Sequence, residues 1–205
     1  MKYNRLLVGV AMTLSAMVMK AEIKLPHMFG DNMVMQRNSD CNIWGTADAL
    51  KTVKITTSWN GKTYKVKVGD DGKWKLKIST PDAGGPYDIS LSDGKALTLH
   101  NILIGEVWIC SGQSNMEMPM KGFKAQPVDG ALHELITGAD KDLRLFTVSR
   151  NARLQAVDTL QGKWNAADAE TIRQFSATAY YFGSMLRKSL RIPVGLIVTS
   201  WGGSA

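Results

Sequence analysis

A nearly continuous apolar run limits what this chain can fold into. Residues Ile102–Cys110 contain a single charged side chain, Glu106. Such a run is typical of a strand that is buried on both faces, as in a parallel sheet. We therefore predict that the run opens an α/β domain, with a domain boundary near residue 104.

The segments after the run alternate between strand and helix patterns. Leu143–Val148 and Val194–Thr199 read as strands, and 166–191 between them reads as one helix that Ile192-Pro193 stops. Strand, helix and strand in this order predict an α/β sheet. The apolar positions of the helix recur at three- and four-residue spacing, at Phe175, Ala179, Phe182, Met185 and Leu186.

The segments before the run predict only strands. Val53–Trp59 and Lys62–Val68 flank Asn60-Gly61, a strong hairpin signal because both central turn positions need a positive φ. Residues 83–86, Ala-Gly-Gly-Pro, are expected to interrupt the strands on either side. Short strands with regular turn signals predict a small β-sandwich over 22–103, with further strands at Trp74–Ile78, Tyr87–Leu91 and Ala96–Leu99.

The first residues have the pattern of an export signal. Two positive charges, Lys2 and Arg5, precede the uncharged stretch Leu6–Met19, which is short for a membrane span. We predict a signal peptide over 1–21 and a periplasmic or secreted protein, with no membrane association after the signal is removed. Its removal would lower the formal net charge from +7 to +4.

The remaining composition excludes several classes of function. The lysines between Lys51 and Lys77 alternate with Thr, Val, Tyr and Trp, as on the solvated face of a sheet, so no nucleic-acid partner is expected. The two cysteines, Cys41 and Cys110, are interpreted as buried free thiols, although an exported protein could join them. No zinc signature is present, and we predict no metal and no cofactor.

The residues after the apolar run are candidates for nucleophilic catalysis. Ser114 lies in Ser111–Met116, directly after the predicted strand, and ligands of open α/β sheets bind beyond the carboxyl ends of the strands. A serine there needs an adjacent base to become a strong nucleophile. Position and spacing alone leave open a turn or capping serine. The segment is not a G-x-S-x-G elbow, because Met116 occupies the place of the second glycine.

Two segments resemble the sialate O-acetylesterase family of SGNH-type hydrolases. Glu106–Met118 is similar to its first block, and 195–204 to its second block, where Thr is more usual than Ser204. Phe175–Gly183 is similar to the helix between the blocks, and Phe29–Arg37 to the start of the family's N-terminal β domain. The resemblance implies a β domain followed by a flavodoxin-like three-layer domain, of which 104–205 is the N-terminal part.

The resemblance also implies roles for individual residues. Ser114 would attack an acetyl carbonyl, and its backbone N–H, with one from Gly202 or Gly203, would bind the oxyanion. Three more residues of the blocks would support the site, namely Gln113, Asn115 and Trp201. The family takes another oxyanion group and an Asp-x-x-His pair from later sequence, so we expect this chain to be an incomplete fragment with little activity alone.

The remaining alternatives concern the substrate and the class of protein. His27, His100 and His133 are interpreted as surface or packing residues. The expected substrate is an O-acetylated sugar or glycan, either a sialic acid or, as in acetylxylan esterases, a plant polysaccharide. An arginine that binds a carboxylate would favour sialic acid, and the candidates are Arg144, Arg150 and Arg153. The rival class is a non-catalytic glycan-binding β-sandwich with a degenerate hydrolase remnant.

Overall fold

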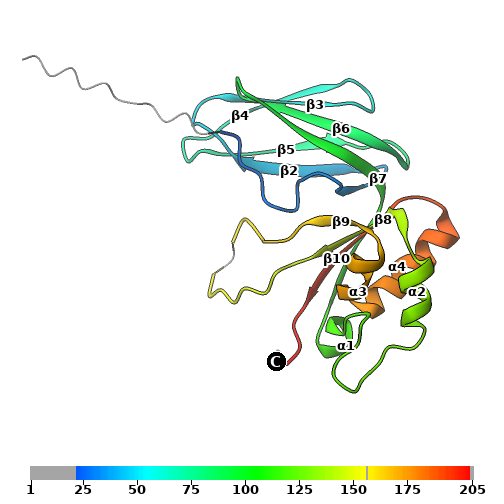
Figure 1. Ribbon diagram of the computed structural model, residues 1–205. Coiled ribbons are helices and arrows are strands. Elements are labelled where there is room, and N and C mark those ends of the chain that lie inside the picture. Colours follow the sequence, from blue (N-terminus) through cyan, green and yellow to red (C-terminus); the bar gives the residue numbers. More distant parts are fainter. Residues whose placement is uncertain (1–21, 156, 204–205) are drawn as a thin grey trace, which may run out of the picture.

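The structure is a computed structural model that describes residues 22–155 and 157–203. The predicted signal peptide and Ser204 lie outside the described residues. Figure 1 shows an all-β part joined to a part in which helices pack on one side of a sheet. No helix of the described residues is long and apolar enough to cross a membrane.

Ten strands and four helices make up the described residues. The strands are β1 Val34–Gln36, β2 Asp40–Thr46, β3 Thr52–Thr57, β4 Thr63–Lys67, β5 Lys73–Ser79, β6 Gly84–Ser92, β7 Ala96–Gly112, β8 Asp140–Thr147, β9 Trp164–Ala167 and β10 Val194–Ser200. The helices are α1 Ser114–Glu117, α2 Ala131–Thr137, α3 Ala169–Gln174 and α4 Ala177–Leu190. Eight strands form one mixed sheet in the order β4-β3-β6-β7-β10-β8-β9, with β1 also paired to β7.

The all-β part is built from antiparallel pairs. β3 pairs with β4 and β6, β6 pairs with β7, and β2 pairs with β5 in a separate two-stranded sheet. Ile43 of β2, Ile78 of β5 and Ile89 of β6 are fully buried in one apolar cluster that joins the two sheets. The alternating lysines of β5 remain exposed on the other face, as their spacing predicts.

Local turn chemistry in this part is close to the prediction but not identical. The β3–β4 hairpin is confirmed, yet only Gly61 has a positive φ, and the connection spans residues 58–62. The Asn60 side chain explains the wider turn, because it accepts hydrogen bonds from the Thr57 hydroxyl and the Lys62 N–H. The prediction that residues 83–86 interrupt the strands is wrong, since β6 begins at Gly84 and includes residues 84–86 in an irregular register.

β7 connects the two parts. This 17-residue strand passes residue 104 without interruption. Its first half pairs with β6 and with β1, and its second half, Glu106–Gly112, pairs in parallel with β10. The position of the predicted domain boundary therefore falls inside one strand.

The second half of β7 differs from the prediction of a strand buried on both faces. Trp108 is 43% exposed and Ile109 is 71% exposed. The described residues supply no strand beside this half other than β10, and their helices cover only one face of the sheet. The prediction is correct for Ile102–Ile104, where β6, β1 and the apolar cluster surround the strand.

The parallel part follows the predicted order of strand, helix and strand. β10 lies between β7 and β8 and is parallel to both, while β9 is antiparallel to β8 at the edge. The helix predicted over 166–191 is wrong in its extent, because 164–167 form β9 and the helix divides into α3 and α4. Phe175 is extended, Ser176 caps α4 through Ala179 N–H, and Asp168 and Thr171 form a capping box on α3.

The exposure of α4 also departs from the predicted apolar face. Tyr180 is fully buried, whereas Phe182 is 43% exposed and Met185 is 71% exposed. The cysteines are free as interpreted, but Cys41 is only half-buried and Cys110 alone is buried.

Candidate active site

The candidate site lies where β7 and β10 end side by side. Because these strands are parallel and in register, Ser200 is opposite Gly112 at their carboxyl ends. The Trp201 N–H donates a hydrogen bond of 3.1 Å to the Gly112 carbonyl, which continues the pairing by one residue. The two segments singled out in the sequence therefore meet at one edge of the sheet.

Ser114 is presented at this edge by a sharp change of direction. Gly112 has a φ of +155°, and a Cβ there would lie 3.1 Å from the Met116 side chain, so the turn favours glycine. Ser114 is the first residue of α1 and is exposed. Within the part of the chain that the structure describes, its hydroxyl has no hydrogen-bond partner. The side chain is thus accessible to a substrate.

The Gly202-Gly203 turn lies against Ser114. A Cβ placed on Gly202 would be 3.6 Å from Ser114 Cα and would collide with the Glu117 carboxylate. Gly203 has a φ of +75°, a conformation that L side chains rarely adopt. Gly202 is therefore required by the close approach of this turn to the start of α1, whereas Gly203 is favoured by its positive φ alone.

A carboxylate that the sequence did not assign to the site joins these elements. Glu117 Oε2 accepts a hydrogen bond from Gly202 N–H, and Glu117 Oε1 pairs with Arg150 Nη2. The Glu117 side chain is only 18% exposed. Glu117 thus links α1, the glycine turn and the segment after β8. The position of Glu117 three residues after Ser114 can be read from the sequence, but its partners Gly202 and Arg150 are distant from it along the chain.

Two of the predicted supporting residues contact the site through their backbone. Gln113 O accepts from Glu117 N–H at 2.9 Å, and Asn115 O accepts from the Thr178 hydroxyl at 3.0 Å. The second bond fastens α1 to the first turn of α4. Trp201 is 41% exposed beside the turn. Gln113 and Asn115 therefore hold the position of α1.

None of the three histidines reaches Ser114 through a described contact. His100 is on β7, twelve residues before Gly112, so about 40 Å of strand separates them, and its Nδ1 is 3.3 Å from Asp88 Oδ1. His133 is exposed on α2, and His27 is exposed before β1. This agrees with their interpretation as surface residues. The described residues hold no histidine that could act as base for Ser114.

The candidate arginines separate into different environments. Arg144 is 3% exposed and donates to the Lys141 and Asn32 carbonyls and to Asn101 Oδ1, so it joins parts of the fold. Burial lowers the pKa of Arg144. Arg150 is the candidate that lies at the site, where Glu117 pairs with it.

The buried thiol near the site is not a competing nucleophile. Cys110 lies on β7 in the cluster beneath α4, and burial raises its pKa. The thiolate is the reactive form, so this environment disfavours reaction. Among residues 22–155 and 157–203, no three His, Cys, Asp or Glu side chains come together as metal ligands.

Comparisons with known proteins find sialate O-acetylesterases similar to this chain. The sialate O-acetylesterase of Rattus norvegicus is 31% identical over 191 residues, which are 84% of this chain and 34% of that protein. The sialate O-acetylesterase of Homo sapiens is 29% identical over 193 residues, 85% of this chain and 36% of that protein. The chain thus spans about a third of the length of these curated relatives.

A solved structure shares the fold. The structure described as a novel carbohydrate acetylesterase from Xanthomonas citri has a TM-score of 0.83 and 31% identity, covering 90% of this chain and 41% of that chain. No family model matches the chain.

Proposed function

Because the chain belongs to the sialate O-acetylesterase family, we propose that it carries the nucleophile-bearing part of an exported carbohydrate O-acetylesterase. Ser114 is the nucleophile of this proposal. The substrate is an O-acetyl ester of a sialic acid or a related glycan.

One observation carries the proposal. The register that sets Ser200 opposite Gly112 brings an exposed serine and a glycine turn together, although 88 positions separate Ser114 from Gly202. Acyl transfer needs a nucleophile and backbone N–H donors around one reacting carbonyl. A capping or turn serine would not need the bare backbone of a second segment beside it.

The chemistry follows from these positions. Ser114 Oγ attacks the acetyl carbonyl and forms a tetrahedral oxyanion, which the Ser114 N–H and an N–H of the glycine turn would bind. Gly202 N–H already donates to Glu117, whereas the described residues offer no acceptor to Gly203 N–H. We assign the second donor to Gly203 in this arrangement. Loss of one such donor typically costs ~2.7–4 kcal/mol of transition-state stabilisation.

Glu117 and Arg150 act in this proposal as positioning residues. The carboxylate holds the glycine turn at the start of α1, and the guanidinium neutralises it. A negative charge left alone beside the developing oxyanion would oppose the reaction. Arg150 therefore serves the site through Glu117, and no arginine is assigned here to a sugar carboxylate.

The general base is proposed to come from sequence after residue 205. Two observations support the proposal that the chain is a fragment. Among the described residues, the second half of β7 pairs with one strand, β10, and Ile109 is mostly exposed. A further strand and a covering helix would pair this edge and bury this side chain. In the same proposal, 1–21 are a signal peptide, 22–103 a β-sandwich domain, and 104–205 the first part of an SGNH-type α/β domain.

The test compares a polypeptide extended to the length of the relatives with the 205-residue chain. Acetate release from an O-acetylated sialic acid and from acetylated xylan is measured, together with covalent labelling by a fluorophosphonate. We expect activity and labelling in the extended protein, both lost in Ser114→Ala, and little activity in the 205-residue chain.

Ser111→Ala is the matched control, because Ser111 is also exposed and lies three residues earlier on β7. It should keep activity and labelling. Labelling that persists in Ser114→Ala would exclude Ser114 as the nucleophile. An inactive, unlabelled extended protein would favour the non-catalytic glycan-binding alternative.

A further inference from the structure

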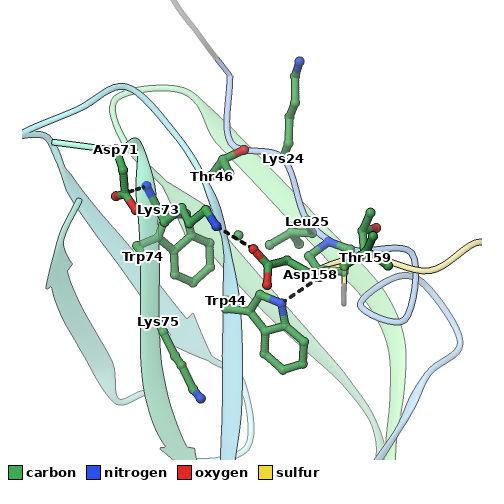
Figure 2. Close-up of a pocket in the computed structure, with 13 residues that line it drawn as sticks. Lys24, Leu25, Trp44, Thr46, Asp71, Lys73, Trp74, Lys75, Asp158 and Thr159 are labelled. Carbon is green, nitrogen blue, oxygen red and sulfur yellow. Dashed lines mark hydrogen bonds and ion pairs between the residues drawn. The ribbon is translucent and has the colours of Figure 1, made fainter. Parts of the chain in front are cut away.

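A cavity of about 860 Å³ is lined by residues other than those of the candidate active site. Figure 2 shows it between β2 and β5 on one side and the segment Val157–Thr159 on the other, with Lys24 and Leu25 at its rim. Its volume is within the range of small-molecule sites, about 300–1,000 Å³. Residues from both parts of the molecule thus form a space that could hold a ligand.

Trp44 is fixed as one wall of this cavity. Its indole N–H donates to the Asp158 carbonyl at 3.2 Å, and Phe29 contacts it edge-on at 4.7 Å between ring centroids. The ring is half-buried, and its polar atom is already used. The indole therefore offers an apolar surface in a fixed orientation, which suits stacking against the C–H face of a sugar ring.

Trp74 and Gly45 pack closely together at the floor of the cavity. Trp74 is 4% exposed and pairs across the ribbon with Gly45. A Cβ on Gly45 would collide with the Lys24 carbonyl and lie 3.0 Å from the Trp74 ring. Glycine is required here so that the chain before β1 can pair with β2 through Lys24 and Thr46. The cavity is therefore a consequence of specific packing between these segments.

Lysines outnumber acidic residues around the cavity. Lys73 pairs with Asp158 at 2.5 Å, and the Asp158 hydrogen bond raises the pKa of Lys73. Lys24, Lys75 and Asp71 also line the cavity, so three lysines face two aspartates. Neither the Lys24 nor the Lys75 ammonium has an acidic partner in the part of the chain that is described. Lys75 is directly opposite Trp44 in the β2–β5 register. An apolar ring and unpaired positive charges together match a sugar that carries a carboxylate.

We propose that this cavity binds an acidic saccharide, independently of Ser114. One sugar ring stacks on Trp44, and its carboxylate lies near Lys75, which is opposite Trp44 in the strand register. The proposal goes beyond the esterase function, because it assigns a second carbohydrate contact to the molecule. Sialic acids and uronic acids share the required chemistry.

The experiment measures binding to the 205-residue chain by isothermal titration and ligand-observed NMR. The probes are 3′-sialyllactose, tri-galacturonic acid and neutral lactose, none of which carries an acetyl ester. We expect at least one acidic sugar to bind at least fivefold more tightly than lactose. The acidic sugar that binds more tightly shows whether the cavity prefers a sialic acid or a uronic acid. Equal binding of lactose, or no binding of either acidic sugar, would overturn the proposal.

Variants locate the binding. Trp44→Ala and Lys75→Glu should each weaken binding at least tenfold, and Lys75→Glu removes no side-chain hydrogen bond or ion pair among the described residues. Lys77→Gln is the matched control, since Lys77 is exposed on the same strand but lies outside the cavity lining. Ser114→Ala should bind normally, so a failed esterase function does not affect this test. Unchanged binding in folded Lys75→Glu and Trp44→Ala would refute the assignment.

Discussion

The two parts of the molecule differ in how completely they bury their apolar side chains. In the first part, residues 22–105, Ile55, Ile89 and Ile102 are fully buried between two sheets. In the second part, residues 106–203, Ile109 and Met185 are each 71% exposed. Both parts have a buried cluster, but only in the first is the cluster enclosed between two sheets.

This difference in burial coincides with a difference in the position of the candidate catalytic residues. The first part contains the closed core, while the second carries Ser114 and the glycine turn on a sheet whose face opposite the helices is covered at Phe146, Trp164 and Ile197 but open at Ile109. The candidate site is thus located in the part of the structure with the more exposed apolar side chains.

The largest expected effect is on the closed core. Ile89→Ala removes buried methyl and methylene groups from a position with no exposure, so the free energy of unfolding should fall by ~2–5 kcal/mol. Urea unfolding followed by tryptophan fluorescence measures this. Ser90→Ala, on the exposed face of the same strand, should change little. A similarly small effect for Ile89→Ala would show that the first part is not closed.

A smaller effect is expected where the two parts touch. A Cβ on Gly195 of β10 would lie 2.8 Å from Val34 Cβ and 3.2 Å from the Trp164 ring. Gly195→Val should therefore lower the free energy of unfolding by ~1–3 kcal/mol through overpacking. Thr199→Val, exposed on the same strand, is the control. No loss of stability in Gly195→Val would mean that the parts pack loosely against each other.

The next prediction concerns a helix cap in the second part. Asp168 accepts from Thr171 N–H at 2.8 Å, and this bond lowers the pKa of Asp168. Asp168→Ala should cost ~0.5–2 kcal/mol of stability at neutral pH. Because the folded pKa is depressed, this contribution is present above the unfolded pKa and is lost as pH falls through the folded pKa.

The difference between wild type and Asp168→Ala should consequently shrink in acid. Asp168→Asn keeps an acceptor for the cap but cannot titrate, so it should retain most of the stability at all pH values. Urea titrations at several pH values between neutral and strongly acidic measure both differences. A difference that is independent of pH would contradict the role of the carboxylate charge.

The smallest effect is expected at the open face. Ile109→Ser should change the stability of the 205-residue chain by less than ~0.5 kcal/mol, because this side chain is mostly exposed. In a polypeptide of the length of the relatives, the same substitution should cost more than ~1 kcal/mol if further chain covers Ile109. Equal effects in the two lengths would remove the support that this face gives to the fragment proposal.

Sequence patterns predicted the parts of the fold that depend on local chemistry. Alternation and turn residues located the β3–β4 hairpin and β5, and Pro193 marked the end of α4. The signals for two helices were also present, as Asp168-x-x-Thr171 and Ser176-x-x-Ala179, but the apolar spacing across Phe175 suggested a single helix.

Features that depend on distant partners were not predictable in this way. The exposure of Ile109 follows from which strands neighbour β7, and the sequence pattern of a buried strand is the same with or without them. At the site, the meeting of Ser114 with Gly202 was expected from family resemblance. The contact of Glu117 with Gly202 and Arg150 required the folded chain, because more than thirty residues separate Glu117 from each.

The uninterrupted passage of β7 between the two parts has a consequence for motion. Hinges in proteins are formed by a few residues that change φ and ψ, and a strand hydrogen-bonded to neighbours at residues 102–106 cannot do so without losing those bonds. The two parts should therefore move as one rigid body. Because Ser114 is exposed at the carboxyl edge of the sheet, access to it then needs no opening and closing of domains.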